Sequence, residues 1–96
     1  MKMIMITYDR ILDHDVVAIL REEHVSSYIK QEGVTGVNQR DIGREQKILP
    51  GTITTIHCAL EDDVARRIVD RLLSVKKGLT DPKALGIFAW ELEESG

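Results

Sequence analysis

The chain has 96 residues, of which 43% are hydrophobic and 30% charged, and its formal net charge is -3. For this length we expect one domain with a single core and no second domain. The small negative charge gives no electrostatic reason to expect nucleic acid or an anionic membrane as a partner, so we expect proteins or small molecules.

Cysteine content and apolar runs bear on the compartment. Cys58 is the single cysteine, so an internal disulfide is excluded, and the N-terminal apolar run is too short for a secretory signal. The longest nearly apolar run, ALGIFAW, is far shorter than the roughly 20 residues of a membrane-spanning helix. We therefore expect a cytoplasmic protein without direct membrane insertion.

The first half of the chain predicts a strand, a helix and a strand. Residues 2–8 form a short β-branched and sulfur-rich run that is typical of a strand. A helix is expected within residues 12–25, with Asp13 accepting hydrogen bonds from the first turn. Its stripe comprises Val16, Val17, Leu20 and His24. Residues 27–34 alternate with polar positions, which favours a strand at the edge of a sheet.

The stretch GVTGVNQRDIGREQKILPG, residues 33–51, has no helix or strand pattern of its own. A structureless connection longer than about 12 to 15 residues is uncommon in a compact domain and is usually functional or disordered. Arg40, Arg44 and Lys47 are spaced along it among glycines, a composition suited to binding an anion. We expect a loop that orders on binding and hinges at Gly33/Gly36 and Pro50/Gly51, although a solvated excursion is the alternative.

The second half repeats the order. Residues 52–60 predict a strand and residues 61–78 a helix. The acidic cluster Glu61, Asp62 and Asp63 suits the start of that helix, and Gly78 its end. Residues 79–83 predict a turn, and residues 84–94 a final strand before an acidic tail.

Two βαβ halves in this order predict an α+β, ferredoxin-like fold. Its antiparallel sheet has four strands, with both helices on one face. The side facing the helices is predicted to contain Ile4, Ile6, Ile56, Cys58, Leu60, Phe88, Trp90 and Leu92. The opposite side is predicted to contain Met3, Met5, Thr7, Ile53, Thr55, His57, Ala59, Ile87 and Ala89. Two helices cannot cover both sides of the sheet, so we expect a homo-oligomer. The alternative is a solvent-exposed face that is rich in threonine.

Catalytic and metal motifs are sparse. His57 and Cys58 are adjacent on a strand and point to opposite faces, so one subunit does not chelate a metal with both. Copies of His57 meeting around a symmetry axis suit a hydrogen-bonded interface or a shared metal. The sequence has neither a nucleophile turn nor a P-loop or dinucleotide fingerprint, and we expect no enzyme. An acylphosphatase-like hydrolase using Arg10 is the least favoured hypothesis, because DRILDHD lacks a glycine for a phosphate cradle.

Three stretches, YIKQEGVTGVNQR, LPGTITTIHCALEDDVARRIVDRLL and GIFAWELEE, together with the double βαβ order, cover nearly the whole chain. In this order they resemble a PII-like signalling protein, a divergent relative of the nitrogen regulatory PII proteins. The resemblance implies a single PII-like domain over residues 1–96, with a T-loop at about 37–50 and a B-loop at about 77–86.

The resemblance also implies a homotrimer with ligand clefts between subunits and a T-loop that switches contact with a partner, such as a transporter or an enzyme. The effector that the resemblance implies is an adenine nucleotide (ADP, ATP or AMP), which a second small anion can accompany. No obligatory cofactor is expected. The candidate ligand-binding residues are Gly36, Gln39, Arg40, Arg44, Lys47, Lys77, Gly78, Lys83 and Gly86. A metal-binding trimer of the CutA type, using His57, is the alternative.

Overall fold

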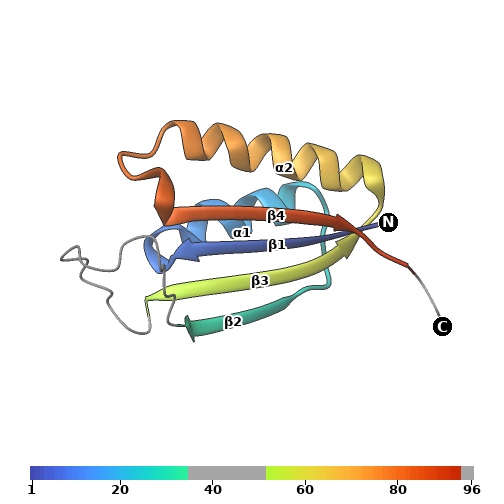
Figure 1. The fold of residues 1–96 in the computed structure, drawn as a ribbon, viewed down its shortest axis with the longest axis horizontal. Coiled ribbons are helices and arrows are strands. Elements are labelled where there is room, and N and C mark those ends of the chain that lie inside the picture. The colour runs from blue at the N-terminus through green and yellow to red at the C-terminus, as the bar shows by residue number, and fades with distance from the viewer. Residues whose placement is uncertain (35–51, 94–96) are drawn as a thin grey trace.

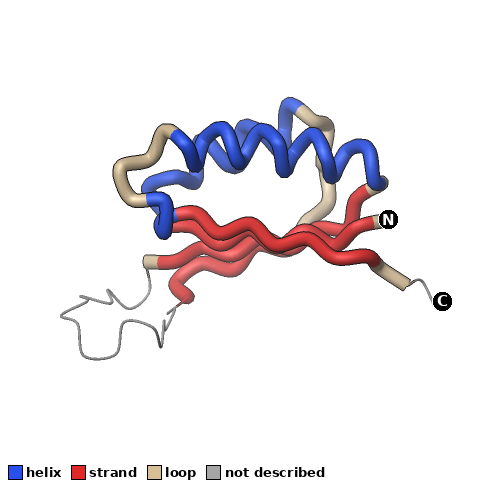
Figure 2. Tube along the Cα trace, turned by 45° about the horizontal axis from the view of Figure 1, so that its top comes forward, coloured by secondary structure: helices blue, strands red, loops and turns tan. Residues whose placement is uncertain are grey.

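The computed structural model describes residues 1–34 and 52–93. These residues form two layers, a four-stranded sheet and two helices that lie on one of its faces (Figure 1 and Figure 2). The elements in chain order are β1 (Lys2–Asp9), η1 (Arg10–Leu12), α1 (Asp13–Glu22), β2 (Ile29–Val34), β3 (Ile53–Leu60), α2 (Asp62–Lys77), η3 (Pro82–Ala84) and β4 (Leu85–Glu91). The predicted ferredoxin-like order is confirmed.

The strand order in the sheet is β2-β3-β1-β4, and each neighbouring pair is antiparallel. Strand β1 therefore lies in the interior, whereas β2 and β4 are the outer strands. The edge position expected for residues 27–34 is confirmed. Strand β2 contains a register shift between Gln31 and Val34, and Gly33 there has a φ of 71°, a left-handed conformation that glycine adopts without steric cost.

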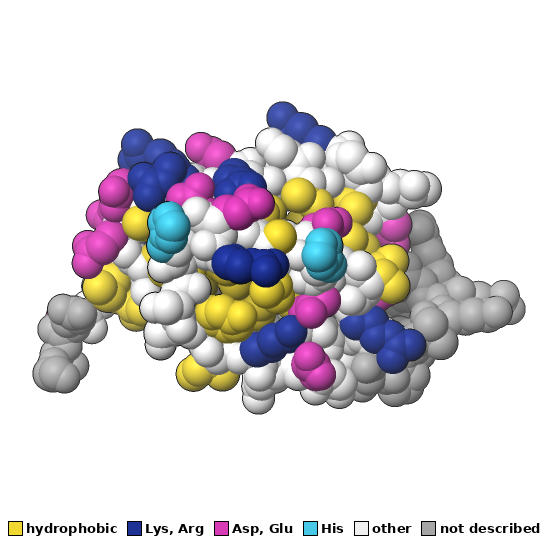
Figure 3. Space-filling view, turned by 180° about the vertical axis from the view of Figure 1, so that it is seen from behind, with side chains coloured by type: hydrophobic (Ala, Val, Ile, Leu, Met, Phe, Trp, Pro, Cys, Tyr) yellow, Lys and Arg dark blue, Asp and Glu magenta, His cyan; other side chains and the backbone are white. Residues whose placement is uncertain are grey.

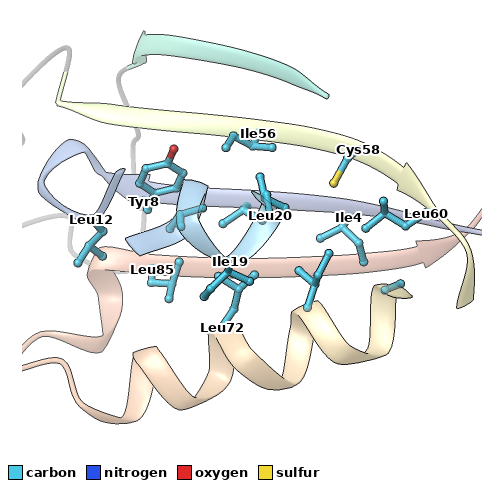
Figure 4. Close-up of a cluster of buried hydrophobic side chains, with 14 residues drawn as sticks. Ile4, Tyr8, Leu12, Ile19, Leu20, Ile56, Cys58, Leu60, Leu72 and Leu85 are labelled. Atoms are coloured by element: carbon cyan, nitrogen blue, oxygen red, sulfur yellow. The ribbon is translucent and has the colours of Figure 1, made fainter. Parts of the chain in front are cut away.

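The core lies between the sheet and the helices (Figure 4). Strand β1 supplies it at alternate positions, and Ile4 and Ile6 are fully buried. Val16 of α1 and Ile68 of α2 close over them, also without exposed surface. Each such side chain contributes about 1.5–3 kcal/mol through burial, so this layer of contacts determines which face the helices cover.

The predicted orientation of the last strand is wrong. Ile4 pairs with Ala89, Ile6 with Ile87 and Met5 with Phe88. Residues paired across antiparallel strands share a face, so Ile87 and Ala89 lie on the helix side, whereas Phe88 and Trp90 lie on the other. Leu92, predicted on the helix side as well, follows the last residue of β4. Leu85, fully buried, fixes this orientation by filling the core at the start of the strand.

The first helix also differs from expectation at both ends. Helix α1 begins directly after the one-turn helix η1, and Asp13 binds Tyr8 and Lys30 instead of capping the first turn. The helix ends at Glu22, and His24 follows in a left-handed conformation with a φ of 60°. His24 is therefore an exposed residue of the connection and not a member of the helical stripe.

The second helix agrees with its predicted bounds within one residue at each end. Asp62 and Asp63 occupy its first turn, and Lys76 and Lys77 its last. This distribution of charge is favourable to the helix dipole. The acidic cluster thus belongs to a helix start, as predicted, although Glu61 makes no side-chain capping hydrogen bond.

Candidate functional site

One end of the domain gathers the chain segments from which the predicted site was built. Strands β1 and β2 end there, β3 begins there, and the connection from α2 to β4 lies beside them (Figure 1). The backbone N–H of Arg10 donates to the carbonyl oxygen of Thr52 over 3.0 Å, which ties η1 to the residue preceding β3. We call this the loop end of the domain.

The connection from α2 to β4 is the predicted B-loop, and hydrogen bonds fix its backbone. The carboxylate of Asp81 accepts from the backbone N–H of Lys83 over 3.0 Å, and the Asp81 carbonyl accepts from the N–H of Ala84 over 3.1 Å. Lys76 Nζ donates to the carbonyl oxygen of Leu85 over 2.6 Å. This connection is therefore a preorganised turn, and the side chains of Lys77 and Lys83 are exposed on it.

The structure brings four of the nine candidate ligand residues into this connection. Lys77 is the last residue of α2, Gly78 follows it, Lys83 lies in η3 and Gly86 is the second residue of β4. Of these, Gly86 lies beside Thr7 on the side of the sheet away from the helices. A Cβ atom there would approach Thr7 Oγ1 to 2.6 Å, so close strand packing requires this glycine.

The other candidates lie outside the described residues, as does the predicted T-loop at 37–50. These candidates are Gly36, Gln39, Arg40, Arg44 and Lys47.

The side of the sheet away from the helices carries a second candidate surface. We call it the open face, and the strand registers assign to it Met3, Met5, Thr7, Ile29, Gln31, Thr55, His57, Ala59, Gly86, Phe88 and Trp90. Ile29 is 65% exposed, Phe88 50% and Trp90 46%. The helix side differs, because charged side chains of both signs spread over it (Figure 3). The open face is thus the side suited to burial against another apolar surface.

His57 and Cys58 lie as predicted on opposite faces of β3. His57 pairs across the sheet with Met5 and Ile29, neither of which is a typical partner for a metal-bound imidazole. Among residues 1–34 and 52–93, no group of three histidine, cysteine or acidic side chains is placed to hold a metal ion. Cys58 is buried, and burial raises the pKa of its thiol to about 11, so it is a core residue.

Neither long helix resembles a membrane span. Within the described part of the chain, no helix is long and apolar enough to cross a bilayer.

A shallow groove of about 260 Å³ lies away from the loop end, beside the first turns of α2. None of the four candidate ligand residues within the described ranges lines it. Its lining residues are Lys2, Ile4, Asp62, Ala65, Arg66, Val69, Asp70 and Ala89.

Sequence reasoning missed several residues that shape these surfaces. Asp81 followed by Pro82 is a typical start of a helical turn, a signal that predicts the η3 cap. Lys76 lacks such a signal, because its acceptor is a backbone carbonyl nine positions away. The position of Phe88 and Trp90 on the open face also has no local signal, because both belong to an apolar run without alternating polar residues.

Comparison with known proteins gives matches at the level of structure only. No family model matches the chain, and no curated protein matches it by sequence. Among solved structures, CPII from Thiomonas intermedia K12, a nitrogen regulatory PII-like protein bound to ADP, AMP and bicarbonate, matches with a TM-score of 0.73. That match covers 99% of this chain and 92% of CPII at 9% identity.

Two further solved structures match the fold of this chain. The apo form of CPII matches with a TM-score of 0.67 and 11% identity, over 93% of this chain and 85% of that one. A candidate PII-like signalling protein from Thermus thermophilus matches with a TM-score of 0.61 and 17% identity, over 93% and 83% of the two chains. The chain therefore has the fold of PII-like proteins.

Proposed function

We propose that this protein is a non-enzymatic PII-like signalling protein that binds an adenine nucleotide between the subunits of a homotrimer. The observation that carries the proposal is the match, over 99% of the chain, to a PII-like protein bound to ADP, AMP and bicarbonate. In the proposed mechanism, the ligand biases the T-loop at about 37–50 between two states, and one of them contacts a partner protein.

The proposed assembly is supported by the open face and by the outer strands. Two helices cover one side of the sheet, and the other side presents Ile29, Phe88 and Trp90 to solvent. Strands β2 and β4 are the two edges of the sheet, and both carry exposed apolar residues on that same face. In the proposed trimer, the β2 edge of one copy meets the β4 edge of the next copy. This head-to-tail arrangement closes into a ring.

The proposed ligand contacts come from two segments. The B-loop contributes Lys77, Gly78, Lys83 and Gly86, and its fixed backbone lowers the entropic cost of binding. The T-loop and the residue before it contribute Gly36, Gln39, Arg40, Arg44 and Lys47. Arginine forks bind phosphate or carboxylate through paired hydrogen bonds, so Arg40 and Arg44 are proposed to hold the phosphates or a second small anion such as bicarbonate.

Isothermal titration of the full chain with ADP, ATP and AMP, with and without bicarbonate, tests this proposal. We expect binding of at least one nucleotide and an affinity loss of about 10- to 100-fold in Arg40→Ala, from the value of a charged hydrogen bond. Arg66→Ala is the matched control, because Arg66 lines the groove near the start of α2 and lies away from the loop end. Absence of binding with every nucleotide would refute the nucleotide proposal.

A further inference from the structure

A polar cluster joins three elements beside the start of α1. Tyr8 of β1 donates its hydroxyl to Asp13 Oδ1 over 2.6 Å. Lys30 of β2 reaches the same carboxylate, with its Nζ 2.8 Å from Oδ1 and 3.0 Å from Oδ2. Asp13 thus links the central strand, the first helix and an outer strand through one side chain.

The two partners of Asp13, Tyr8 and Lys30, differ in how far each side chain is free to move. Tyr8 is 2% exposed, so its hydroxyl is held in the core and breaking its hydrogen bond would leave a buried polar group unsatisfied. Lys30 retains 25% of its side-chain surface, and its Nζ also lies 3.5 Å from Glu32 Oε1 on its own strand. The contact between Tyr8 and Asp13 is therefore the fixed part of the cluster, and Lys30 bridges Asp13 to a carboxylate of its own strand.

Strand β2 is held weakly by its backbone. Ile29, Lys30 and Gln31 pair in register with β3, and the register then shifts before Val34. Gly33, within that shift, has a φ of 71°. Four of the six residues of β2 are exposed, so burial contributes little to holding the strand. The ion pair between Lys30 and Asp13 consequently carries a larger share of the attachment than a surface ion pair usually does.

We propose that Asp13 and Lys30 form a latch that sets the position of the outer strand β2. In the latched position, Lys30 binds Asp13 and holds β2 against helix α1. In the released position, Lys30 keeps Glu32 as its only carboxylate partner, and β2 moves about the shift between Gln31 and Val34. The latch is a property of the folded chain and does not depend on a bound ligand.

Hydrogen exchange of the full-length protein without ligand tests the latch. Lys30→Met should speed the exchange of residues 29–31 at least about ten-fold, the effect of losing about 1.4 kcal/mol, while residues 54–58 of β3 stay protected. Asp13→Asn should also speed the exchange of residues 29–31. Lys30→Arg, which keeps the positive charge, should retain the protection of the wild type. Glu32→Gln should slow exchange, because Lys30 then has Asp13 alone as its carboxylate partner.

Lys2→Met is the matched control, since it also removes a lysine–carboxylate pair, that with Glu91, from a different part of the sheet. It should leave the exchange of residues 29–31 unchanged. The proposal is overturned if Lys30→Met exchanges at the wild-type rate at 29–31. It is also overturned if β3 loses protection equally, because the effect would then be global. Faster exchange in Glu32→Gln would contradict the role of Glu32 in the released position.

Discussion

Replacement of Trp90 by serine should weaken association of the subunits and leave the fold of each subunit intact. Trp90 lies on the open face and is 46% exposed, and Phe88 beside it is 50% exposed. A large aromatic side chain buries about 150–250 Å² when fully covered, so each retains roughly 100 Å² for an interface. At about 25 cal/mol per Å², covering that area contributes about 2.5 kcal/mol, close to two orders of magnitude in an association constant.

Sedimentation velocity over a concentration series measures this effect, with circular dichroism as the check on folding. We expect the trimer of Trp90→Ser to dissociate at a concentration at least about two orders of magnitude higher than the wild type, because each of its three subunits loses that area. Ile11→Ser is the matched control, because Ile11 is 78% exposed but lies on η1, outside the open face. A monomeric wild type, or equal dissociation of Trp90→Ser and wild type, would refute the role assigned to the open face.

Three further outcomes are expected. Gly86→Ala should lower the free energy of unfolding by about 1–3 kcal/mol because of the 2.6 Å approach to Thr7 Oγ1, and Thr7→Ala should recover part of it in urea denaturation. His24→Gly should raise the free energy of unfolding by roughly 1 kcal/mol, since the φ of 60° at this position is strained for histidine; an unchanged midpoint would contradict this. Cys58 should resist an aromatic disulfide reagent at neutral pH until the protein unfolds, because it is buried and its thiol pKa is raised to about 11.

The order of helices and strands was accessible from the sequence because each element has a local pattern. Val64, Ile68, Leu72 and Val75 recur at helical spacing, and the observed helix α2 buries Ile68 and Leu72. Alternation in β1 likewise predicted that Ile4 and Ile6 face the core. Local periodicity determines which face of an element is apolar, and this was sufficient for the fold class.

The orientation of β4 was not accessible in the same way. In ALGIFAW every residue except glycine is apolar, so either set of alternate positions satisfies the core. Pairing with β1 resolves the choice, because Tyr8 pairs with Leu85 and Leu85 fills the core. The face of β4 that points to the core is thus set by its register with a strand far away in the sequence, and no local pattern predicts that register.

Asp13 shows how a local signal is overruled by tertiary contacts. Its position before an apolar stripe is typical of a helix cap, yet its carboxylate is used by Tyr8 and Lys30. Hydrogen bonds from Lys30 and Tyr8 also lower the pKa of Asp13, so the carboxylate stays ionised to lower pH than usual. Lys30 lies 17 positions away, beyond the reach of a capping pattern.

The candidate site was predictable only in outline, for a related reason. The turn between α2 and β4 was predictable from local signals at Gly78 and Pro82, whereas its assignment as a B-loop with ligand residues rests on the resemblance to PII-like proteins. Gly86 also packs closely against Thr7 in a distant strand, whereas its sequence surroundings predicted only a ligand contact. Cross-strand contacts of this kind have no local signature, so sequence reasoning did not find this packing role of Gly86.

The outer strands connect the open face to the latch. Ile29 lies on the open face of β2, and its neighbour Lys30 points to the helix side, where Asp13 binds it. Any displacement of β2 that separates Lys30 from Asp13 therefore also displaces Ile29 relative to Phe88 and Trp90 at the far edge. A surface packed across the open face would resist that displacement, because its contacts extend from one edge strand to the other. Association through the open face and closure of the latch should thus favour each other, with each stabilising the same position of β2.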